Sequence, residues 1–451
     1  MNAVLVAVVV MLALALLRVH VVLALFIGAI VGGLLSGLGL DATMVAFQEG
    51  LSGGAKIALS YALLGAFAMA VASAGLPKLL ADSLLGKLGV TNEETKSRAV
   101  AVTKWLMLAG ILAMAVMSQN LIPVHIAFIP LIIPPLLSVF NKLQLDRRLV
   151  TCILTFGLIT TYMWIPLGFG SIFLNDILLG NIDNAGMSTD GINVMKAMGI
   201  PALGMFLGLL IAVFITYRKP REYEERPITE TDKDSSGEIS RYKIIVSIIA
   251  IIATFAVQVA MQAMDMEADS LLVGALVGLT IFMGTGAVDW KKADDVFTAG
   301  MRMMALIGFI MITAQGFAAV MQATGEVESL VNTSAELFAG NKAAAALVML
   351  LVGLVVTMGI GSSFSTLPIV ATIYVPLCAS MGFSPLATIA IVGTAGALGD
   401  AGSPASDSTL GPTSGLNADG QHDHIRDSVI PTFLHFNIPL LIAGWIAAMV
   451  L

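Results

Sequence analysis

Hydrophobic runs of about 20 residues, separated by short polar segments, follow one another along the whole chain. That length suits membrane-crossing α-helices, whereas the strands of a transmembrane barrel would alternate over about ten residues. The pattern predicts an all-α polytopic membrane protein with about seven helices in each half, some interrupted or re-entrant. We expect them at about 2–17, 21–39, 55–76, 99–117, 121–141, 149–178 and 195–217, and then at about 244–262, 270–287, 303–323, 343–360, 364–381, 386–414 and 430–451.

The composition agrees with this class of protein. The chain is 57% hydrophobic and 12% charged, with a mean hydropathy of +0.93, which is more apolar surface than one soluble core could bury. The first run lacks a preceding basic residue and a cleavage site, so it is predicted to be a span rather than a signal peptide. Cys152 and Cys378 both lie in apolar stretches, which argues against a disulfide framework or a CxxC metal site. The sequence contains no cluster of basic residues of the kind that would indicate a nucleic-acid partner.

Four segments of the first half recur in the same order in the second half. "IGAIVGG" (27–33) matches "VGALVGL" (273–279), and "FQEGLSGG" (47–54) matches "FTAGMRMM" (297–304). "GAFAMAVASAG" (65–75) then matches "QGFAAVMQATG" (315–325), and "IIPPLLS" (132–138) matches "IYVPLCA" (373–379). This collinear similarity predicts two structural repeats, at 1–217 and 244–451, joined by a hydrophilic linker at 218–243.

Lys and Arg residues indicate how each repeat is oriented. Residues 77–98 of the first half contain four Lys or Arg residues, whereas the equivalent segment 325–342 contains three glutamates and one lysine. In the segments ahead of the third span of each half the bias is reversed, and the Lys and Arg residues lie in the second half. Basic loops remain cytoplasmic, so the two repeats are predicted to have inverted topology, with a cytoplasmic linker between them.

Polar, glycine and proline residues interrupt the apolar runs at two places in each half. The first half has "MSQNLIP" (117–123) and "TFGLITTYMWIPLGFGS" (155–171), and the second has "GIGSSFSTLP" (359–368) and "GDAGSPASDST" (399–409), with Pro166 and Pro404 aligned. Paired interruptions of inverted repeats mark a midplane binding site. The predicted solute contacts are Ser118, Gln119, Asn120, His125, Thr161, Trp164, Gly361, Ser362, Ser363 and Thr366.

An unpaired carboxylate near the bilayer centre costs roughly 3 kcal/mol or more, so the presence of Asp400 and Asp407 in this apolar region needs an explanation. Three explanations are possible. The pair could lie in an aqueous loop, or it could pair with a buried base, for which His125 is the deep candidate. Alternatively it could bind a cation or a proton. Burial disfavours a charged carboxylate and bound Na⁺ favours it, so the two cations would compete. Hydroxyl oxygens suit Na⁺, which gives a predicted cation site of Asp400, Ser403, Ser406, Asp407 and Ser408.

The segment Gly399-Asp400-x-x-Ser403-Pro404-x-Ser406-Asp407-Ser408-Thr409 resembles the G-D-x-x-S-P-x-S-D-[ST]-T signature of the NhaC-type sodium/proton antiporter family. "LLRVHVVLALFIGAIVGG" and "GLSGGAKIALSYALLGAF" resemble the amino-terminal region of one branch of that family. The resemblance implies an inverted-repeat fold, commonly a homodimer, in the inner (plasma) membrane of a bacterium. It also implies that no cofactor is needed beyond Na⁺ or H⁺ as coupling ions.

The resemblance leaves the transported substrate open. It favours a secondary transporter that exchanges Na⁺ for H⁺ by alternating access. Members of this branch are also assigned as amino-acid permeases, with histidine among the proposed solutes, so cation-coupled transport of an amino acid or small carboxylate is the alternative. Tyr162 and Trp164 stand where the second half has the Asp400 region, which fits a site for one cation cluster and a small solute. A passive channel is less consistent with inverted repeats and buried acids, and no catalytic motif indicates an enzyme.

Overall fold

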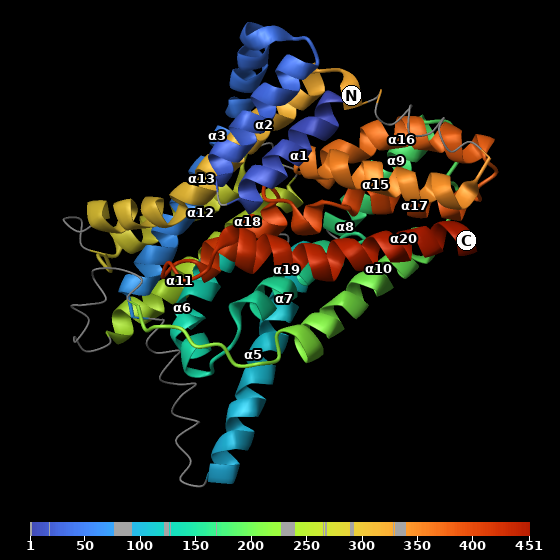
Figure 1. Ribbon diagram of the computed structural model, residues 1–451. Coiled ribbons are helices and arrows are strands. Elements are labelled where there is room, and N and C mark those ends of the chain that lie inside the picture. The colour runs from blue at the N-terminus through green and yellow to red at the C-terminus, as the bar shows by residue number, and fades with distance from the viewer. Residues whose placement is uncertain are drawn as a thin grey trace.

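The computed structural model describes residues 2–75, 93–120, 126–226, 240–327, 329 and 340–451, apart from residues 18, 127, 168, 265, 267 and 289–292. The described chain is all-helical, as predicted (Figure 1). The main helices of the first half are α1 (Ala3–Leu16), α2 (Val21–Leu35), α3 (Gly39–Ser73), α5 (Glu93–Asn120), α6 (Phe128–Lys142), α7 (Arg147–Ile159), α8 (Phe169–Ser171), η2 (Ile172–Leu179), α9 (Gly180–Asn184), α10 (Val194–Ile211) and η3 (Ala212–Thr216). Those of the second half are α11 (Arg241–Ala263), α12 (Ser270–Gly284), α13 (Ala293–Ala323), α15 (Lys342–Ile360), α16 (Ser363–Ser380), α17 (Pro385–Ala397), η6 (Asp400–Gly402), α18 (Asp407–Leu416), η7 (His424–Val429), α19 (Ile430–Thr432), η8 (Phe433–Asn437) and α20 (Ile438–Val450).

Seven of the described helical stretches have the length and apolar composition needed to cross a membrane, and six shorter apolar helices accompany them. Large apolar side chains remain exposed along the outer faces of these helices, for example Phe214 and Ile215 after α10 and Ile248 and Ile252 on α11. Such a surface is stable in lipid but not in water. The protein is a multi-pass membrane protein.

Two helices begin ten or more residues earlier than predicted. The structure starts α3 at Gly39 instead of residue 55, and α13 at Ala293 instead of residue 303. The polar residues ahead of each apolar run contain no proline, and Asp294 and Asp295 in the first turn of α13 interact favourably with the helix dipole. Hydropathy alone therefore placed both starts too late. Residues 77–88 and 326–339 are short amphipathic segments that the sequence predicts to lie at the membrane interface. They lie almost entirely outside the described residues.

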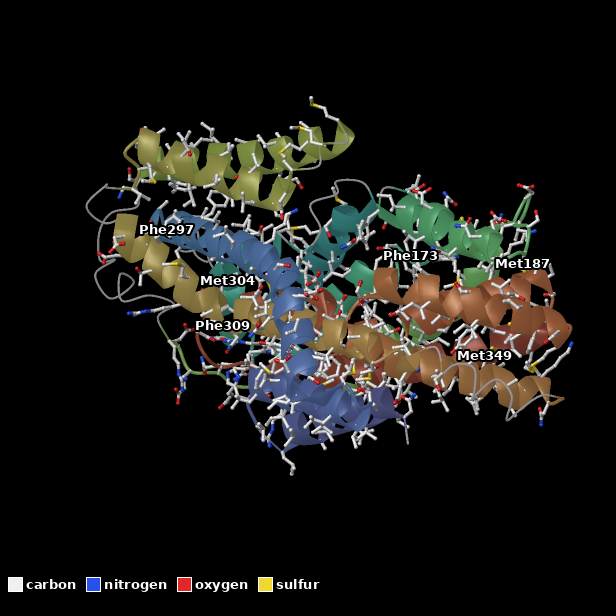
Figure 2. The ribbon with its side chains drawn as sticks, turned by 90° about the horizontal axis from the view of Figure 1, so that it is seen from above. Phe173, Met187, Phe297, Met304, Phe309 and Met349 are labelled. Atoms are coloured by element: carbon white, nitrogen blue, oxygen red, sulfur yellow. The ribbon has the colours of Figure 1, made fainter. Side chains whose placement is uncertain are left out.

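The two longest described helices, α3 and α13, pack antiparallel along much of their length near the middle of the molecule (Figure 1). Glycines bring their backbones together: a methyl group on Gly54 would lie 2.4 Å from Ile312 Cα, and one on Gly300 would lie 2.2 Å from Ala66 N. The hairpins α1–α2 and α11–α12 lie on opposite sides of this pair (Figure 2). Phe173 and Met349 lie in the neighbouring bundle that includes α15, α16 and α17 (Figure 2).

Equivalent helices of the two halves exchange contacts, since each packs against an element of the opposite half. Helix α2 packs on α13 while α12 packs on α3, and α6 packs on α18 while α16 packs on η2. The aligned phenylalanines take part in this exchange. A methyl group on Gly28 would lie 3.1 Å from Phe317 Cε2, and one on Gly278 would lie 2.6 Å from Phe67 Cε2. This exchange accords with the two predicted repeats; their opposite direction across the membrane stays a prediction.

The start of the linker is held against the turn between α18 and η7. Arg147 is fully buried and forms a bidentate ion pair with Asp419, with both N···O distances 2.6 Å. Its guanidinium also lies over the ring of Tyr223, 4.3 Å from the centroid. Burial opposes ionisation of Asp419, but the hydrogen bonds and charge of Arg147 outweigh it and hold the pKa of Asp419 below its usual range. These contacts fix the turn at 417–423.

Candidate functional site

Glycine and proline break the helix at the second-half motif. Helix α17 ends at Ala397, Leu398 is extended, and Gly399 has φ +91°, a conformation that a side chain would disfavour. A single 3₁₀ turn, Asp400–Gly402, precedes the extended Ser403. Helix α18 then begins at Asp407, with the Ser406 hydroxyl accepting a capping hydrogen bond from Ser408 N. The break therefore leaves Asp400 between two helix ends.

Hydroxyl groups from three parts of the chain surround the Asp400 carboxylate. Tyr162 Oη donates to Oδ2 over 2.8 Å, and Ser363 Oγ donates to the same oxygen over 3.1 Å. Ser406 donates to Oδ1, and Ser408 Oγ lies 3.5 Å from Oδ1. Asp400 is only 7% exposed. This set of oxygen atoms is of the kind that Na⁺ prefers.

The surroundings of Asp400 test two of the three predicted explanations, the aqueous loop and the buried partner base. Burial excludes an aqueous loop at Asp400. Among the described residues, the ion pairs lie elsewhere and none includes Asp400. His125, the candidate base, lies outside the described residues. A buried carboxylate held by hydroxyls alone is suited to exchange one small cation for another.

The other predicted cation ligands are more dispersed. Ser403 Oγ turns away from Asp400, lies 3.3 Å from Met358 O, and accepts from Ala405 N. Asp407 occupies the first position of α18 and is partly exposed. Of the predicted set, the structure thus brings Ser406 and Ser408 onto Asp400, but not Ser403.

The first-half break, residues 160–167, has a different construction. Asn120 Nδ2 lies 3.4, 3.2 and 3.1 Å from the carbonyl oxygens of Thr161, Ile165 and Leu167. Thr161 Oγ1, just beyond α7, donates to Gly157 O in the last turn of that helix. Asn120 therefore supports the unwound backbone of this break.

The remaining predicted solute contacts divide into those near the site and those away from it. Ser363 contacts Asp400, and Gly361, the αL cap of α15, approaches Ala405, since a methyl group on it would lie 3.4 Å from Ala405 O. Trp164 is 37% exposed and donates to Met195 O. Ser118, Ser362 and Thr366 take part in local helix-end hydrogen bonds, and Gln119 is buried at the end of α5.

Two residues at the site were missing from the predicted set. Tyr162 aligns with Asp400 when Pro166 is placed on Pro404, and its hydroxyl also lies 2.9 Å from Ser363 Oγ. Asn437 Oδ1 accepts from Gly399 N over 3.2 Å and holds the turn that presents Asp400. A lone asparagine in the apolar run of the last helix was the signal for Asn437, because a buried amide requires partners.

The residues described contain no cluster of three His, Cys, Asp or Glu side chains able to hold a metal ion. The site has hard oxygen atoms and one carboxylate, which suits a monovalent cation as cargo better than a resident transition metal.

Comparison with known proteins identifies the chain's relatives. The model of the Na⁺/H⁺ antiporter family matches residues 153–445, and a second model, of a Na⁺-H⁺ antiporter family, matches residues 2–88. The chain belongs to the Na⁺/H⁺ antiporter family. It is a secondary transporter, and the resemblance carried by the 399–409 motif is confirmed.

Relatives match this family member from end to end. An uncharacterized membrane protein of Vibrio parahaemolyticus is 56% identical over 100% of both chains. The Bacillus subtilis protein named "Putative amino acid transporter YuiF" is 50% identical, again over 100% of both chains. A solved structure, the YdaH transporter of Alcanivorax borkumensis, shows 13% identity over 91% of this chain and 88% of its own, with a TM-score of 0.38, too low to assign shared geometry.

Proposed function

We propose that this protein exchanges Na⁺ for H⁺ and that Asp400 is the group for which the two cations compete. The observation that carries the proposal is the buried Asp400 carboxylate held by Tyr162, Ser363, Ser406 and Ser408. When Na⁺ is absent, a proton can neutralise the carboxylate. When Na⁺ enters, carboxylate and hydroxyl oxygens replace part of its hydration shell and the proton leaves.

We place Asp407 in the same site as a second negative charge. It begins α18 seven residues after Asp400, where the helix dipole favours a carboxylate. Its charge would add to the attraction for a cation without being a direct ligand. Ser403 is assigned to the shape of the break, because it contacts Met358 and Ala405.

The alternating access proposed for this exchange depends on the predicted inverted repeats, 1–217 and 244–451. Their equivalent loops should face opposite sides of the membrane, and the alignment of Pro166 with Pro404 makes Ser188 equivalent to Arg426. Both positions are exposed, and both native cysteines are buried. Ser188→Cys and Arg426→Cys should therefore react with an impermeant maleimide from opposite sides of oriented vesicles. Labelling of both from one side would reject the inversion. The homodimer implied by the family remains a separate prediction.

A second function, amino-acid transport coupled to Na⁺ or H⁺, is favoured by the name of the Bacillus relative at 50% identity. Both functions can use the same cation site, but they differ in what must be present for protons to move. The test is a Na⁺ pulse applied to proteoliposomes that contain a pH-sensitive dye. Proton flux without organic solute supports the exchanger, whereas flux only after an amino-acid mixture is supplied supports the coupled transporter.

A further inference from the structure

Protein covers little of the apolar span of α5. In the most apolar stretch of this span, 100–120, 17% of the residues are buried, against 44% in the span 194–216 formed by α10 and η3. Val102 and Leu106 are 50% and 68% exposed. Figure 1 shows the start of α5 extending beyond the neighbouring helices. An exposed apolar surface of this kind needs lipid or another protein against it.

An aromatic pair joins α5 to η3. The rings of Trp105 and Phe214 stack with their centroids 5.6 Å apart and an interplanar angle of 28°. Both remain accessible, Trp105 at 45% and Phe214 at 55%. Leu207 and Ile211 continue the exposed apolar face along α10, at helical spacing from Phe214. Together these side chains form a strip on which an acyl chain can lie.

Three basic side chains lie at the end of this strip. Lys104 adjoins Trp105, and Arg218 and Lys219 follow Phe214 by four and five residues. Arg218 and Lys219 are exposed, whereas Lys104 is partly buried. The segment before α5 and the linker after η3 are both predicted to be cytoplasmic, so the strip ends at the headgroups of that leaflet. We refer to these five residues as the α5–η3 edge.

Lys104 has lost part of its water without gaining an ion-pair partner. Among the ion pairs of the described residues, none includes Lys104. The carboxylate that acts on it, Asp146, is already bound by an arginine. Arg148 Nε donates to the two carboxylate oxygens over 3.0 and 3.1 Å, and Arg148 Nη2 donates to Oδ2 over 2.6 Å. Burying an unpaired ammonium is costly, so we expect an anion to reach it from the membrane side.

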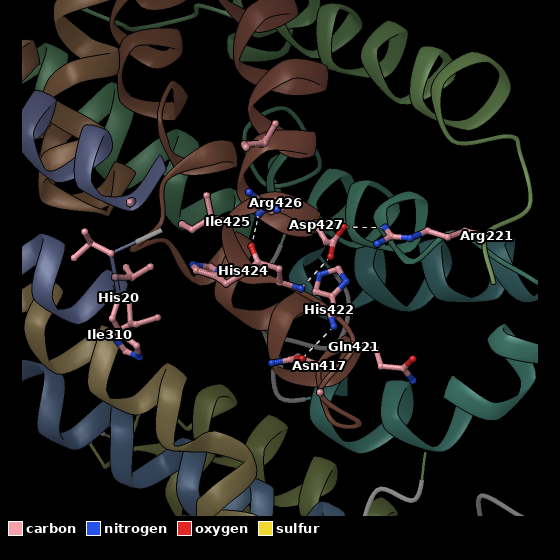
Figure 3. A pocket seen from close by; sticks show the side chains of 16 residues that line it. His20, Arg221, Ile310, Asn417, Gln421, His422, His424, Ile425, Arg426 and Asp427 are labelled. Atoms are coloured by element: carbon pink, nitrogen blue, oxygen red, sulfur yellow. Dashed lines mark hydrogen bonds and ion pairs between the residues drawn. The ribbon is translucent and has the colours of Figure 1, made fainter. Parts of the chain in front are cut away.

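The charge around Asp146 is therefore positive. Arg221 Nη1 lies 3.7 Å from Asp146 Oδ1 and also pairs with Asp427 over 2.8 Å (Figure 3). Lys104, Arg148 and Arg221 thus share two carboxylates. This leaves one positive charge in excess, before the other two cations of the α5–η3 edge are counted.

Two acids of the linker have partners of their own. Glu222 Oε1 accepts from Gln144 Nε2 over 3.3 Å, and Glu224 pairs with Arg226 over 2.7 Å. The excess positive charge therefore remains available to an anion. Because this charge adjoins an apolar strip, the anion that fits is one that carries hydrocarbon chains.

We propose that the α5–η3 edge binds an anionic phospholipid of the cytoplasmic leaflet. The three cations of the edge contact its phosphate, and an acyl chain lies along the aromatic pair and the strip on α10. Lysine and arginine carry their charge to the headgroup level while their stems lie on apolar surface. A lipid held in this way fills the side of α5 that protein leaves open and stabilises its contact with η3. Binding here is separate from the chemistry at Asp400, so it applies to either of the proposed transport functions.

The test is native mass spectrometry of the purified full-length protein, titrated with phosphatidylglycerol or with phosphatidylcholine of the same acyl chains. The measured quantity is the ratio of the two dissociation constants. We expect the wild type to prefer phosphatidylglycerol by about 25-fold or more, since each cation near an anionic headgroup contributes about fivefold. Lys104→Gln should lower this preference about fivefold, and Lys104→Arg, which keeps the charge, should retain it.

Two comparisons separate a defined lipid site from general surface charge. Lys243→Gln removes an exposed lysine at the start of α11, on the same predicted side of the membrane, and should leave the preference unchanged. Inorganic phosphate should not displace phosphatidylglycerol, because it lacks acyl chains. Equal affinity of the wild type for the two lipids, an equal loss in Lys243→Gln, or displacement by inorganic phosphate would overturn the proposal.

Thermal unfolding in detergent measures what the bound lipid does for the protein. Phosphatidylglycerol should raise the Tm of the wild type and of Lys243→Gln by more than it raises the Tm of Lys104→Gln, because a ligand of the folded state stabilises in proportion to its affinity. An equal rise in all three proteins would count against the α5–η3 edge as the binding site.

Discussion

The two interrupted segments, 160–167 and 398–406, occupy equivalent positions in the two halves but carry different chemistry. Pro166 and Pro404 align, and this alignment pairs Tyr162 with Asp400. In the structure these two side chains meet, with Tyr162 Oη 2.8 Å from Asp400 Oδ2. One break therefore supplies a neutral hydroxyl and the other supplies the charge.

The difference shows that the same feature, an interrupted helix, can either support the backbone or form a binding site. In the first break a single amide, Asn120, lies against three backbone carbonyls, so protein groups satisfy the exposed backbone. In the second, side-chain hydroxyls surround a carboxylate and Asn437 holds the turn from behind. We expect mutations in the second break to alter transport strongly. In the first break, mutation of Asn120 should alter mainly stability, and mutation of Tyr162 should alter Na⁺ binding only slightly.

The largest effect is expected for Asp400→Asn. The amide is nearly isosteric but cannot bear the negative charge that holds Na⁺, so Na⁺-driven proton flux should fall by about 100-fold or more. Flux is measured in proteoliposomes, with Asp190→Asn, an exposed loop variant, as the matched control. Substantial flux in Asp400→Asn would remove the distinction between the two breaks.

Asn120→Ala should act in the opposite way. It removes the donor near three buried carbonyls and should lower the free energy of unfolding by about 1–3 kcal/mol, since unmet buried polar groups are costly. Thermal unfolding in detergent reports this loss, and the KM for Na⁺ of the surviving protein should stay near the wild-type value. A large rise in KM without a loss of stability would place Asn120 in the binding site.

Ser406→Ala should weaken Na⁺ binding by about tenfold, because it removes a hydroxyl on Asp400 that contributes about 1.4 kcal/mol to binding. Loss of the cap of α18 should separately lower the free energy of unfolding by about 1 kcal/mol. Ser414→Ala is the comparison, since Ser414 bonds only within its own helix, to Gly411 O. Equal KM values for the two variants would show that the hydroxyl on Asp400 is not a ligand.

The smallest effect is expected for Tyr162→Phe. It removes one of several hydroxyls on Asp400 and leaves the ring contacts with Phe169 and Phe173, so KM for Na⁺ should rise about threefold with little change in kcat. Steady-state flux at varied Na⁺ separates the two constants. Complete loss of flux would mean that the first break shares the cation site more deeply than its neutral chemistry indicates.

Much of the architecture was predictable because membrane-crossing helices need long apolar runs, and this requirement is written directly in the sequence. The interruptions were also visible, since proline and glycine cannot continue a regular helix without cost. The starts of α3 and α13 were not, because polar residues can extend a helix beyond its apolar portion. Hydropathy detects the lipid-facing part of a helix and not its full length.

The candidate site was predictable only in part. Asp400, Ser406 and Ser408 were identified because they crowd into one short motif. Tyr162 and Asn437 reach this motif from distant segments, and contacts between remote residues leave no local pattern. Trp164 stays a predicted solute contact: it is 37% exposed, which suits either a solute cavity or a surface anchor.

The most direct test of the central claim is the affinity of purified protein for ²²Na⁺, measured across a series of pH values. If Na⁺ and H⁺ compete for the Asp400 carboxylate, the dissociation constant should rise as the pH falls, by about tenfold per unit at the acidic limit for one proton, and Asp400→Asn should bind no measurable Na⁺. A dissociation constant that is independent of pH, or wild-type binding by Asp400→Asn, would contradict the account.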